Sequence, residues 1–374
     1  MRCCIYIIII CILYFIIKNS NKNQVIEVYP KQIKPECKGK SKIRYYLDKN
    51  SNKLVRYYEH VLQKKDKINV LEKADLIFKV GYLKKLSDDD VIELNKVIVG
   101  NMGIKQLHDK DSLWTILVNK YGLNEAAKLT PESVKIEPNI NYDDFFNRNN
   151  PPYLLKKNIE NGDGILIVNN KIDAIEELKR DKEYVVLQKL IESLLIKGYA
   201  FKIRTYVVTA CIDGNTSVYL AKDSPVAYAL TKWDSNNLSF DNIYASRNWF
   251  DDMSQSERIK QLDGKETMLS KMPNDLMNTI LPQIIEKSKK VFSIVNLCSK
   301  QNTILISGID FLVDTNHNVY FLELNTLPGV ANPYAIDNEA IKYEKQFKQN
   351  LYNDSLSIIF PCSFENTGSL LQII

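Results

Sequence analysis

The stretch that decides the fold is SGIDFLVD (residues 307–314), followed by TNHN (315–318) and VYFLELN (319–325). Two apolar runs rich in β-branched and aromatic residues flank four residues that favour turns. This pattern predicts a β-hairpin with a short loop. We therefore expect two antiparallel strands whose polar side chains are brought together by their register.

The polar residues of this hairpin include Asp310, Glu323 and Asn325. With residues 315–318 as the loop, Asp310 lies opposite Glu323, about 5 Å away at Cβ. Side chains alternate along a strand, so Glu323 and Asn325 share a face. Carboxylate and amide oxygens suit a Mg²⁺ ion that bridges nucleotide phosphates. An ordinary hairpin whose polar side chains face water has the same pattern, and spacing alone does not separate the two interpretations.

The chain has 374 residues, enough for two or three subdomains. Its net charge of +5 fits either a solvated surface or a field that attracts an acidic or phosphorylated partner. No zinc-ligand spacing, Arg-rich tract or RNA-binding signature occurs, which argues against nucleic acid as a partner. We expect the chain to act as a monomer.

Residues 3–17 form an uninterrupted apolar run between Arg2 and Lys18. Its length lies between the core of a signal peptide and a full membrane span of about 20 residues. No small-x-small cleavage site follows, so we expect an uncleaved anchor, with a cleaved signal or a buried element as alternatives. Positive charges after the run outnumber those before it, which predicts a body that faces the cytosol. A secreted or a soluble cytoplasmic protein is the alternative.

The cysteines agree with a cytosolic body. Three of the seven lie in the apolar run, and the other four are scattered: Cys37, Cys211, Cys298 and Cys362. Their number and spacing predict no disulfide framework.

A strand–glycine loop–strand pattern lies upstream, with apolar runs at 153–156 and 165–168 and with Gly162 and Gly164 between them. Glycines let backbone N–H groups approach phosphates, and Lys156 adds a point charge. An ordinary hairpin loop explains the same residues.

Residues 201–208 alternate between apolar and polar side chains, so Lys202 and Arg204 share one face. Two neighbouring cations repel each other unless an anion lies between them, which makes this pair a candidate phosphate site. Lys222, at the end of a strand predicted at 218–222, would meet the same anion.

The strand predicted at 184–191 runs into a polar pair, Gln188 and Lys189. Its exit would offer backbone groups to an adenine edge and Lys189 to a phosphate. A surface turn is the alternative.

We predict a mixed fold of helices and strands, of the α/β (α+β) class. Breaks in composition divide the chain into segments. The predicted divisions are a hydrophobic segment (1–18), a linker (19–42), a small N-terminal α/β domain (43–129), a central subdomain with the glycine loop (130–200), a C-terminal subdomain with the hairpin (201–362) and a tail (363–374).

In this order, the segments between about residues 97 and 328 resemble the tubulin–tyrosine ligase-like family of ATP-grasp ligases, of which the chain looks like a divergent member. Each segment is modestly specific, and their order makes the resemblance strong. The segments, with the family pattern beside each, are 109–113 (R-K-D-x-L), 129–133 (P-x-T), 153–157 (W-I-x-K-P), 162–165 (G-x-G-I), 186–192 (V-x-Q-K-Y-I-E), 201–207 (F-D-I-R-x-Y-V), 308–311 (G-x-D-F) and 322–328 (L-E-x-N-x-x-P).

The resemblance implies a role for each matching residue. It implies phosphate binding by Lys110 and Lys156 under the loop of Gly162 and Gly164, adenine binding by Gln188, Lys189, Leu190 and Ile191, a γ-phosphate or acyl-phosphate contact by Arg204, and Mg²⁺ binding by Asp310, Glu323 and Asn325.

Three positions depart from the family pattern. Lys202 stands where the family has an acid, Ala200 replaces a basic residue, and Ser246 lies in an altered polar segment. The family handles the incoming amino acid and the acceptor at these positions, so the resemblance supports ATP binding better than it supports a particular amino acid. We expect Lys202 and Arg204 to be catalytic, with Lys202 replacing the lost lysine or reshaping the site for a different acid.

The activity that the resemblance implies uses ATP and Mg²⁺ to join a free amino acid, such as glutamate, glycine or tyrosine, to a protein through an acylphosphate. The acceptor would carry an acidic, tubulin-like tail. A ligase for a small molecule or peptide, and a nucleotide-binding pseudoenzyme or membrane adaptor, stay open as alternatives. The histidines have no partner visible in the sequence and receive no role: His60, His108 and His317.

Overall fold

The computed structural model describes most of the chain from residue 43 onward. The described residues are 43–47, 58, 61–62, 66–69, 73–78, 97–99, 104–138, 140–159, 164–245, 253–262, 264–298, 301–326, 339–364 and 366–374. The chain divides into two compact units, 1–37 and 38–374, and every described residue belongs to the second. The predicted apolar segment 3–17 and linker 19–42 lie outside the described residues. No helix in the described part of the chain is long and apolar enough to cross a membrane.

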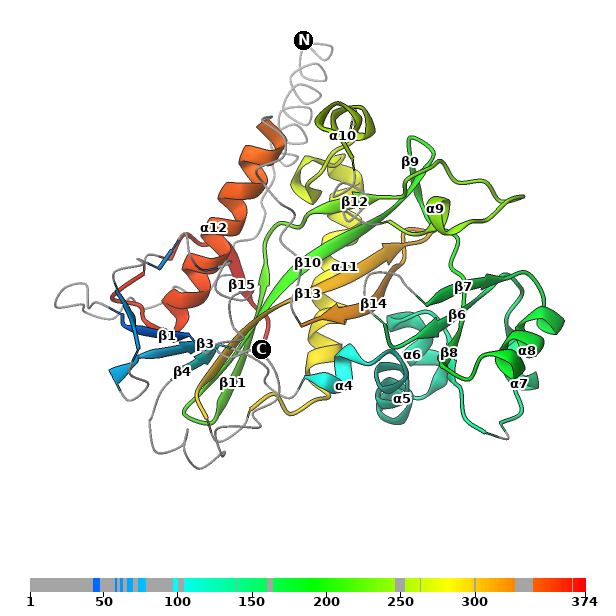
Figure 1. The fold of residues 1–374 in the computed structure, drawn as a ribbon, viewed down its shortest axis with the longest axis horizontal. Helices are drawn as coiled ribbons and strands as arrows, with labels where there is room; N and C mark the ends of the chain where they lie inside the picture. Colours follow the sequence, from blue (N-terminus) through cyan, green and yellow to red (C-terminus); the bar gives the residue numbers. More distant parts are fainter. Residues whose placement is uncertain are drawn as a thin grey trace, which may run out of the picture. The chain divides into compact units, whose positions relative to one another are not determined.

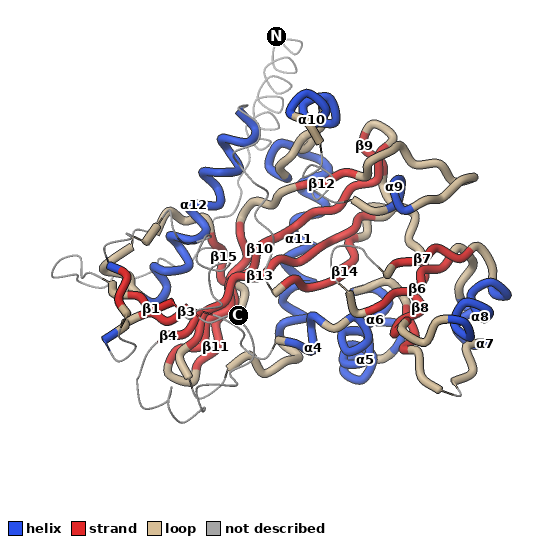
Figure 2. The backbone as a smooth tube through the Cα atoms, in the orientation of Figure 1, coloured by secondary structure: helices blue, strands red, loops and turns tan. Residues whose placement is uncertain are grey.

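A large mixed sheet forms the centre of the second unit (Figures 1 and 2). In spatial order its strands are β15 (Leu370–Gln372), β11 (Asn215–Ala221), β10 (Tyr199–Ile212), β13 (Thr303–Val313), β4 (Val97–Val99), β3 (Leu76–Phe78), β1 (Tyr45–Leu47) and β2 (Lys67–Ile68). Three further strands join it: β12 (Val226–Tyr228) and β9 (Leu195–Ile196) pair with β10, and β14 (Val319–Asn325) pairs with β13.

Helices cover both faces of this sheet, and the alternation of buried residues along β10 and β13 shows which helix meets which face. Ile203 and Val207 of β10 pack with α11 (Asn274–Phe292), whereas Tyr206 and Val208 pack with α12 (Glu339–Ile359). The long β10 and β13 are nearly continuous apolar runs because both of their faces are covered. The face of α11 also carries α4 (Lys105–His108), α5 (Lys110–Tyr121) and α6 (Leu123–Leu129).

A second, four-stranded sheet has a core of its own. Its spatial order is β5 (Ser133–Lys135), β8 (Tyr184–Lys189), β6 (Tyr153–Lys157) and β7 (Ile165–Val168). Aromatic residues of α7 (Asp143–Arg148) pack on Tyr153. Asn170 caps the N-terminus of α8 (Lys171–Arg180), and its side chain accepts a hydrogen bond from the N–H of Asp173. The strands predicted around the glycine loop and at 184–191 are therefore present, and the mixed α/β class is confirmed.

The hairpin predicted at 307–325 is formed by β13 and β14, and Asp310 pairs with Glu323 as expected. With residues 315–318 as the loop, the predicted register places Asp314 opposite Val319, but in the structure Val313 lies there. A bulge next to Asp310 absorbs the extra residue, so the predicted pair is restored beyond it. Asp314 instead closes the loop by accepting hydrogen bonds from later backbone N–H groups.

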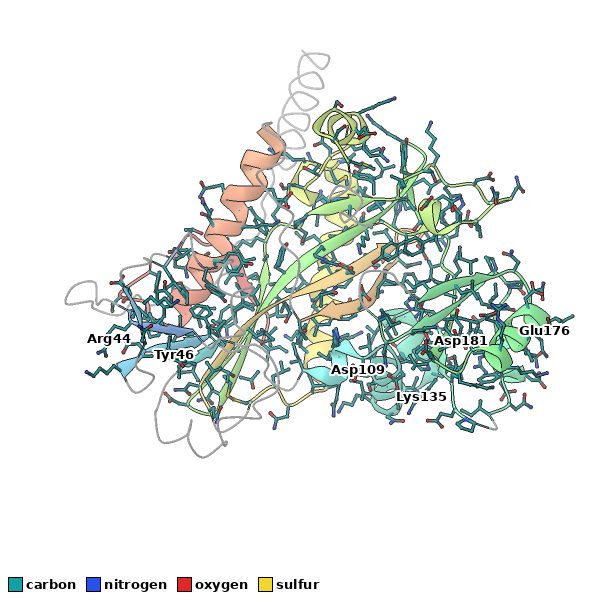
Figure 3. The ribbon with its side chains drawn as sticks, in the orientation of Figure 1. Arg44, Tyr46, Asp109, Lys135, Glu176 and Asp181 are labelled. Atoms are coloured by element: carbon teal, nitrogen blue, oxygen red, sulfur yellow. A yellow bond between two sulfur atoms is a disulfide. The ribbon has the colours of Figure 1, made fainter. Side chains whose placement is uncertain are left out.

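The first described strands extend the large sheet. β4 runs parallel to β13, and Arg44, labelled in Figure 3, pairs with Asp75 at a nitrogen–oxygen distance of 3.2 Å just before β3. Residues near the C-terminus also join the sheet, since β15 pairs with β11. The remaining short helices are α9 (Phe240–Ile243), α10 (Gln255–Leu262) and the 3-10 turn η4 (Leu269–Lys271).

The cysteine prediction was wrong. Cys211 of β10 and Cys298, beyond α11, form a disulfide with a Cα–Cα distance of 5.1 Å, and Cys362 is also disulfide-bonded. The two partners are 87 residues apart in the sequence, so the spacing from which we predicted no disulfide framework carried no information about their separation in space. Disulfides are rare in the cytosol, and this pairing removes the support that the cysteines gave to a cytosolic body.

Candidate active site

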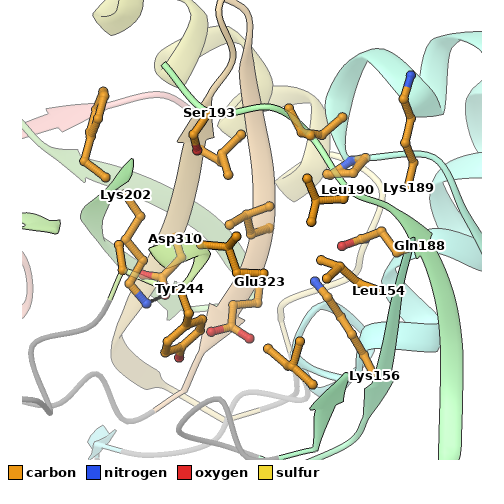
Figure 4. Close-up of a pocket in the computed structure, with 18 of the residues that line it drawn as sticks. Leu154, Lys156, Gln188, Lys189, Leu190, Ser193, Lys202, Tyr244, Asp310 and Glu323 are labelled. Carbon is orange, nitrogen blue, oxygen red and sulfur yellow. Dashed lines mark hydrogen bonds and ion pairs between the residues drawn. The ribbon is translucent and has the colours of Figure 1, made fainter. Parts of the chain in front are cut away.

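A pocket lies between the small sheet and the β10–β13–β14 part of the large sheet. It is an open pocket with about 820 Å³ of space between its walls, part of which is open to solvent. Figure 4 shows Lys156 and Gln188 entering from the small sheet, opposite Glu323, Tyr244 and Asp310. Gln188 and Asp310, which are 122 positions apart in the sequence, therefore line the same pocket.

Asp310 is the most enclosed charged group in the pocket, with 1% of its surface exposed. It accepts a hydrogen bond of 2.8 Å from the Nζ of Lys202. Arg204 donates two more, of 2.6 Å from Nε and 2.7 Å from Nη2. The predicted pair of cations on β10 therefore does face an anion, and that anion is Asp310 of the neighbouring strand.

The charges in this cluster stabilise one another. Burial opposes ionisation of Asp310, but the neighbouring cations outweigh it and hold the pKa of Asp310 well below its ordinary value. For Lys202 and Arg204 burial acts to lower the pKa, and the carboxylate of Asp310 reverses the shift, so both values are raised. All three groups are therefore ionised at neutral pH.

Tyr244 closes the pocket beneath this cluster. The Nζ of Lys202 lies 4.9 Å from the centre of the Tyr244 ring, a cation–π distance. Burial raises the pKa of Tyr244, and the charge of Lys202 opposes that shift. The neighbouring Ala245 also lines the pocket, whereas Ser246, one of the three departures from the family pattern, lies outside the described residues.

Lys110 and Lys156 form a second group of cations, on the opposite wall. Lys110 begins α5, and its Nζ lies 3.0 Å from the carbonyl of Ile159 and 3.9 Å from Oε2 of Glu323. Burial lowers the pKa of Lys156 to about 8; Glu323 opposes this shift, and the charges of Lys110 and Lys202 add to it. These lysines lie where an anionic ligand would relieve their repulsion.

The strand exit predicted to hold adenine lines the same pocket: Gln188, Lys189, Leu190 and Ile191. Gln188 is buried, and its amide donates to the hydroxyl of Ser133 on β5. The N–H of Lys189 is donated to Glu132 and that of Leu190 to Pro152. An adenine edge would therefore meet the backbone groups of this segment that make neither of these two hydrogen bonds.

Four sequence-predicted site residues in the described part of the chain are not among the residues that line the pocket: Gly164, Arg204, Lys222 and Asn325. Gly164 has a φ of +78°, and a Cβ there would lie 2.9 Å from Cβ of Lys157, so this position requires glycine. Gly162 lies outside the described residues. Lys222 is exposed after β11, its N–H is donated to Ser369, and it is not among the residues that line the pocket.

The sequence missed one residue that lines the pocket and one contact to the strand that carries Glu323. Tyr244 received no role from the sequence, because no periodic pattern marks it. His108 was assigned no role, yet its Nδ1 lies 2.8 Å from the carbonyl of Leu324, between Glu323 and Asn325. Only the packing of α4 against β14 brings the ring there, so no local signal revealed it.

Two of the three predicted metal ligands fit a divalent cation. The carboxylate of Glu323 faces the pocket (Figure 4). The buried Nδ2 of Asn325 has no hydrogen-bond partner among the described residues, so none of them fixes the orientation of this amide, whose Oδ1 is the atom that would ligate a cation. Asp310 differs, because both of its oxygens already accept from cations. Among the described residues, no three acidic, histidine or cysteine side chains converge as a metal cluster. A cation would therefore depend on Glu323, Asn325 and oxygens of a ligand.

Comparison with known proteins now places the chain. The model of the tubulin–tyrosine ligase family matches residues 106–367. This match covers well over half of the 374 residues, and the chain belongs to the tubulin–tyrosine ligase family.

Individual relatives are distant. Tubulin glycylase 3D of Tetrahymena thermophila is 26% identical over 248 residues, 61% of this chain and 22% of that protein. Tubulin glycylase 3C of the same organism is 22% identical over 205 residues, 49% of this chain and 18% of that protein. A probable tubulin–tyrosine ligase of Schizosaccharomyces pombe is 26% identical over 173 residues, 45% of this chain and 41% of that protein. The chain spans less than half the length of each of these relatives.

Proposed function

We propose that the chain is an ATP-dependent ligase that joins a free amino acid to a protein of the tubulin type. The observation that carries the proposal is the convergence of Lys110, Lys156 and Lys202 with Glu323 in one pocket, in a chain of this family. Several cations that share a pocket with a carboxylate and an amide fit a phosphate chain better than an uncharged ligand. The ATP-grasp organisation, with a small N-terminal domain, is part of the same proposal.

The proposed reaction has two steps. An acceptor carboxylate attacks the γ-phosphorus of ATP, the bond from that phosphorus to the bridging oxygen breaks, and ADP leaves. The amine of the incoming amino acid then attacks the acylphosphate carbonyl, loses a proton and expels inorganic phosphate, so an amide bond is formed. No covalent bond to the protein is needed, and catalysis comes from positioning and charge neutralisation.

The described residues take roles by position. Lys110 and Lys156 neutralise the phosphate chain from one wall, and Lys202 and Arg204 do so from the other. Segment 188–191 holds the base. Bound Mg²⁺, held by Glu323 and Asn325, would offset phosphate charge.

The relatives support the choice of acceptor and amino acid. Two bear the name tubulin glycylase and one the name probable tubulin–tyrosine ligase. We therefore propose an acidic tubulin-like tail as acceptor, with glycine and tyrosine tested before glutamate. The altered positions Ala200 and Lys202 line the side of β10 where the choice would be made.

Membrane attachment through residues 3–17 is a proposal that depends on the sequence alone, as is a cytosolic orientation. The disulfide between Cys211 and Cys298 favours an oxidising compartment instead. Protease protection of the tagged full-length chain in sealed microsomes would separate the two orientations.

A nucleotide-binding pseudoenzyme is the second candidate, and a specific observation favours it. Asp310, which the resemblance assigns to Mg²⁺, is held by Lys202 and Arg204. A protein whose pocket binds nucleotide but positions no metal ion at Asp310 would act as an adaptor and not as an enzyme.

One experiment separates these candidates. Purified full-length protein is incubated with ATP, tubulin and isotope-labelled glycine, tyrosine or glutamate, and modified peptides are identified by mass spectrometry. The proposal predicts labelled tubulin that disappears with Glu323→Gln and persists with Lys120→Met, an exposed lysine of α5. Nucleotide binding without label on any acceptor would favour the pseudoenzyme.

A further inference from the structure

The carboxylate of Asp310 is fully engaged by protein cations, and this sets it apart from Glu323. Three N–H donors from Lys202 and Arg204 lie within 2.8 Å of its oxygens. Glu323, by contrast, is 26% exposed, and the nearest cation, Lys110, is 3.9 Å away. A metal ion that approaches Asp310 must therefore displace a buried donor, whereas one that approaches Glu323 displaces mainly water.

The number of charges leads to the same conclusion. Lys202, Arg204 and Lys110 bring three positive charges, and Asp310 and Glu323 bring two negative ones. The ammonium group of Lys156 adds to the positive side. Without a ligand the pocket is net positive, which opposes a free divalent cation and favours a polyanion.

Lys202 is the residue that makes Asp310 unavailable to a metal ion. Its side chain is 9% exposed, it lies between Asp310 and the ring of Tyr244, and both contacts favour a cation at this point. Arg204 alone would already pair with Asp310 through two donors. Lys202 therefore supplies the second positive charge at a carboxylate that would otherwise keep capacity for a metal.

We infer that the Lys202 ammonium takes the place of a divalent cation on Asp310. The nucleotide-free pocket then binds no divalent cation, and the phosphate chain of a nucleotide binds before any Mg²⁺ joins it at Glu323. This inference rests on the proposed function in one respect, that the pocket binds nucleotide.

The test uses the full-length protein and Mn²⁺ alone as the probe, with free Mn²⁺ measured by electron paramagnetic resonance. We expect no Mn²⁺ binding to the nucleotide-free protein below about 1 mM, and binding at least about tenfold tighter in Lys202→Met. Lys202→Arg keeps the charge and should behave like the parent, as should the control Lys120→Met. Nucleotide-free parent protein that binds Mn²⁺ as tightly as Lys202→Met would overturn the inference.

A second arm measures ATP affinity by calorimetry in EDTA and in Mg²⁺. The parent should bind ATP in EDTA within about tenfold of its affinity in Mg²⁺, and Lys202→Met should lose at least about tenfold in EDTA and less in Mg²⁺. ATP binding that requires Mg²⁺ in the parent would overturn the inference and leave the proposed function standing. No ATP binding in either buffer would overturn the proposed function, while the Mn²⁺ arm still decides the role of Lys202. The parent measurements decide both points even if Lys202→Met fails to fold.

Discussion

The two walls of the pocket use the same kind of residue in opposite ways. On the β10–β13 wall, Lys202 is held by Asp310 and its pKa is raised, although burial acts to lower it. On the β6 wall, Lys156 forms no ion pair among the described residues, and burial lowers its pKa to about 8. Both lysines come from strands that line one cavity. A partner within hydrogen-bond distance, more than burial, decides whether a lysine here is a permanent cation or one that waits for a ligand.

Removal of Asp310 should have the largest effect, because it breaks the ion pairs on the β10–β13 wall. Asp310→Ala leaves Lys202 and Arg204 without their carboxylate, which we expect to cost about 3–5 kcal/mol of unfolding free energy. It should also abolish Mg·ATP-dependent turnover. Urea unfolding and a phosphate-release assay measure the two effects. A combined Asp310→Asn, Lys202→Met variant should recover part of the stability, and failure to recover any would argue against the ion cluster as the cause.

Removal of the disulfide tests whether the β10–β13 wall of the pocket depends on the other end of β10. Cys211 lies on β10, the strand that carries Lys202 and Arg204. Cys211→Ser should lower stability by about 2–4 kcal/mol, since the bridge closes a loop of 87 residues. We expect ATP affinity to stay within about twofold of the parent at a temperature where the variant is folded. A parent protein in which both thiols react with a maleimide without reduction would contradict the bridge.

Substitution of Glu323 should change turnover much more than it changes stability. It is partly exposed and 3.9 Å from Lys110, so Glu323→Gln should change unfolding free energy by less than about 1 kcal/mol. Turnover should fall by at least about 100-fold, because an essential negative ligand is neutralised. Steady-state kinetics and thermal unfolding give the two values. Unchanged turnover would remove Glu323 from the site.

The smallest expected effect is a pH dependence of ATP affinity, which should come from Lys156 on the β6 wall alone. Lys156 is a cation below its pKa of about 8 and loses its proton above it. ATP affinity should therefore be constant below pH 7.5 and fall by up to about tenfold per unit above pH 8. Lys156→Met should bind more weakly and lose this dependence. Calorimetry between pH 6.5 and 9.5 measures the profile, and an unchanged slope in the variant would assign the titration elsewhere.

The sequence was most informative where the chemistry depended on local geometry. Alternation along a strand was enough to pair Lys202 with Arg204 on one face and to bring Asp310 opposite Glu323. The second result held even though the register near the loop was one residue off, because a bulge beside Asp310 compensated. A bulge is one extra residue in one strand, and the alternation of the two runs does not mark where it occurs, so the hairpin pattern did not predict it.

Contacts between distant segments were not predictable in the same way. That Asp310 is the anion between Lys202 and Arg204 depends on β10 and β13 being neighbours, although their residues are 106 positions apart. The same holds for the disulfide of Cys211 and for His108 on the carbonyl of Leu324. Lys222, by contrast, directly follows β11, which overlaps the strand predicted at 218–222, but it is not among the pocket residues.

By itself, the sequence determined the strands, the two-residue alternation along them and the hairpin that faces Asp310 toward Glu323. These features depend on residues a few positions apart, whose geometry is set by the backbone. Only the tertiary structure decided which strands lie side by side, and therefore that Lys202 neutralises Asp310 while Lys156 is left for a ligand. Strand order follows from the packing of whole helices and sheets, and no short stretch of sequence specifies it.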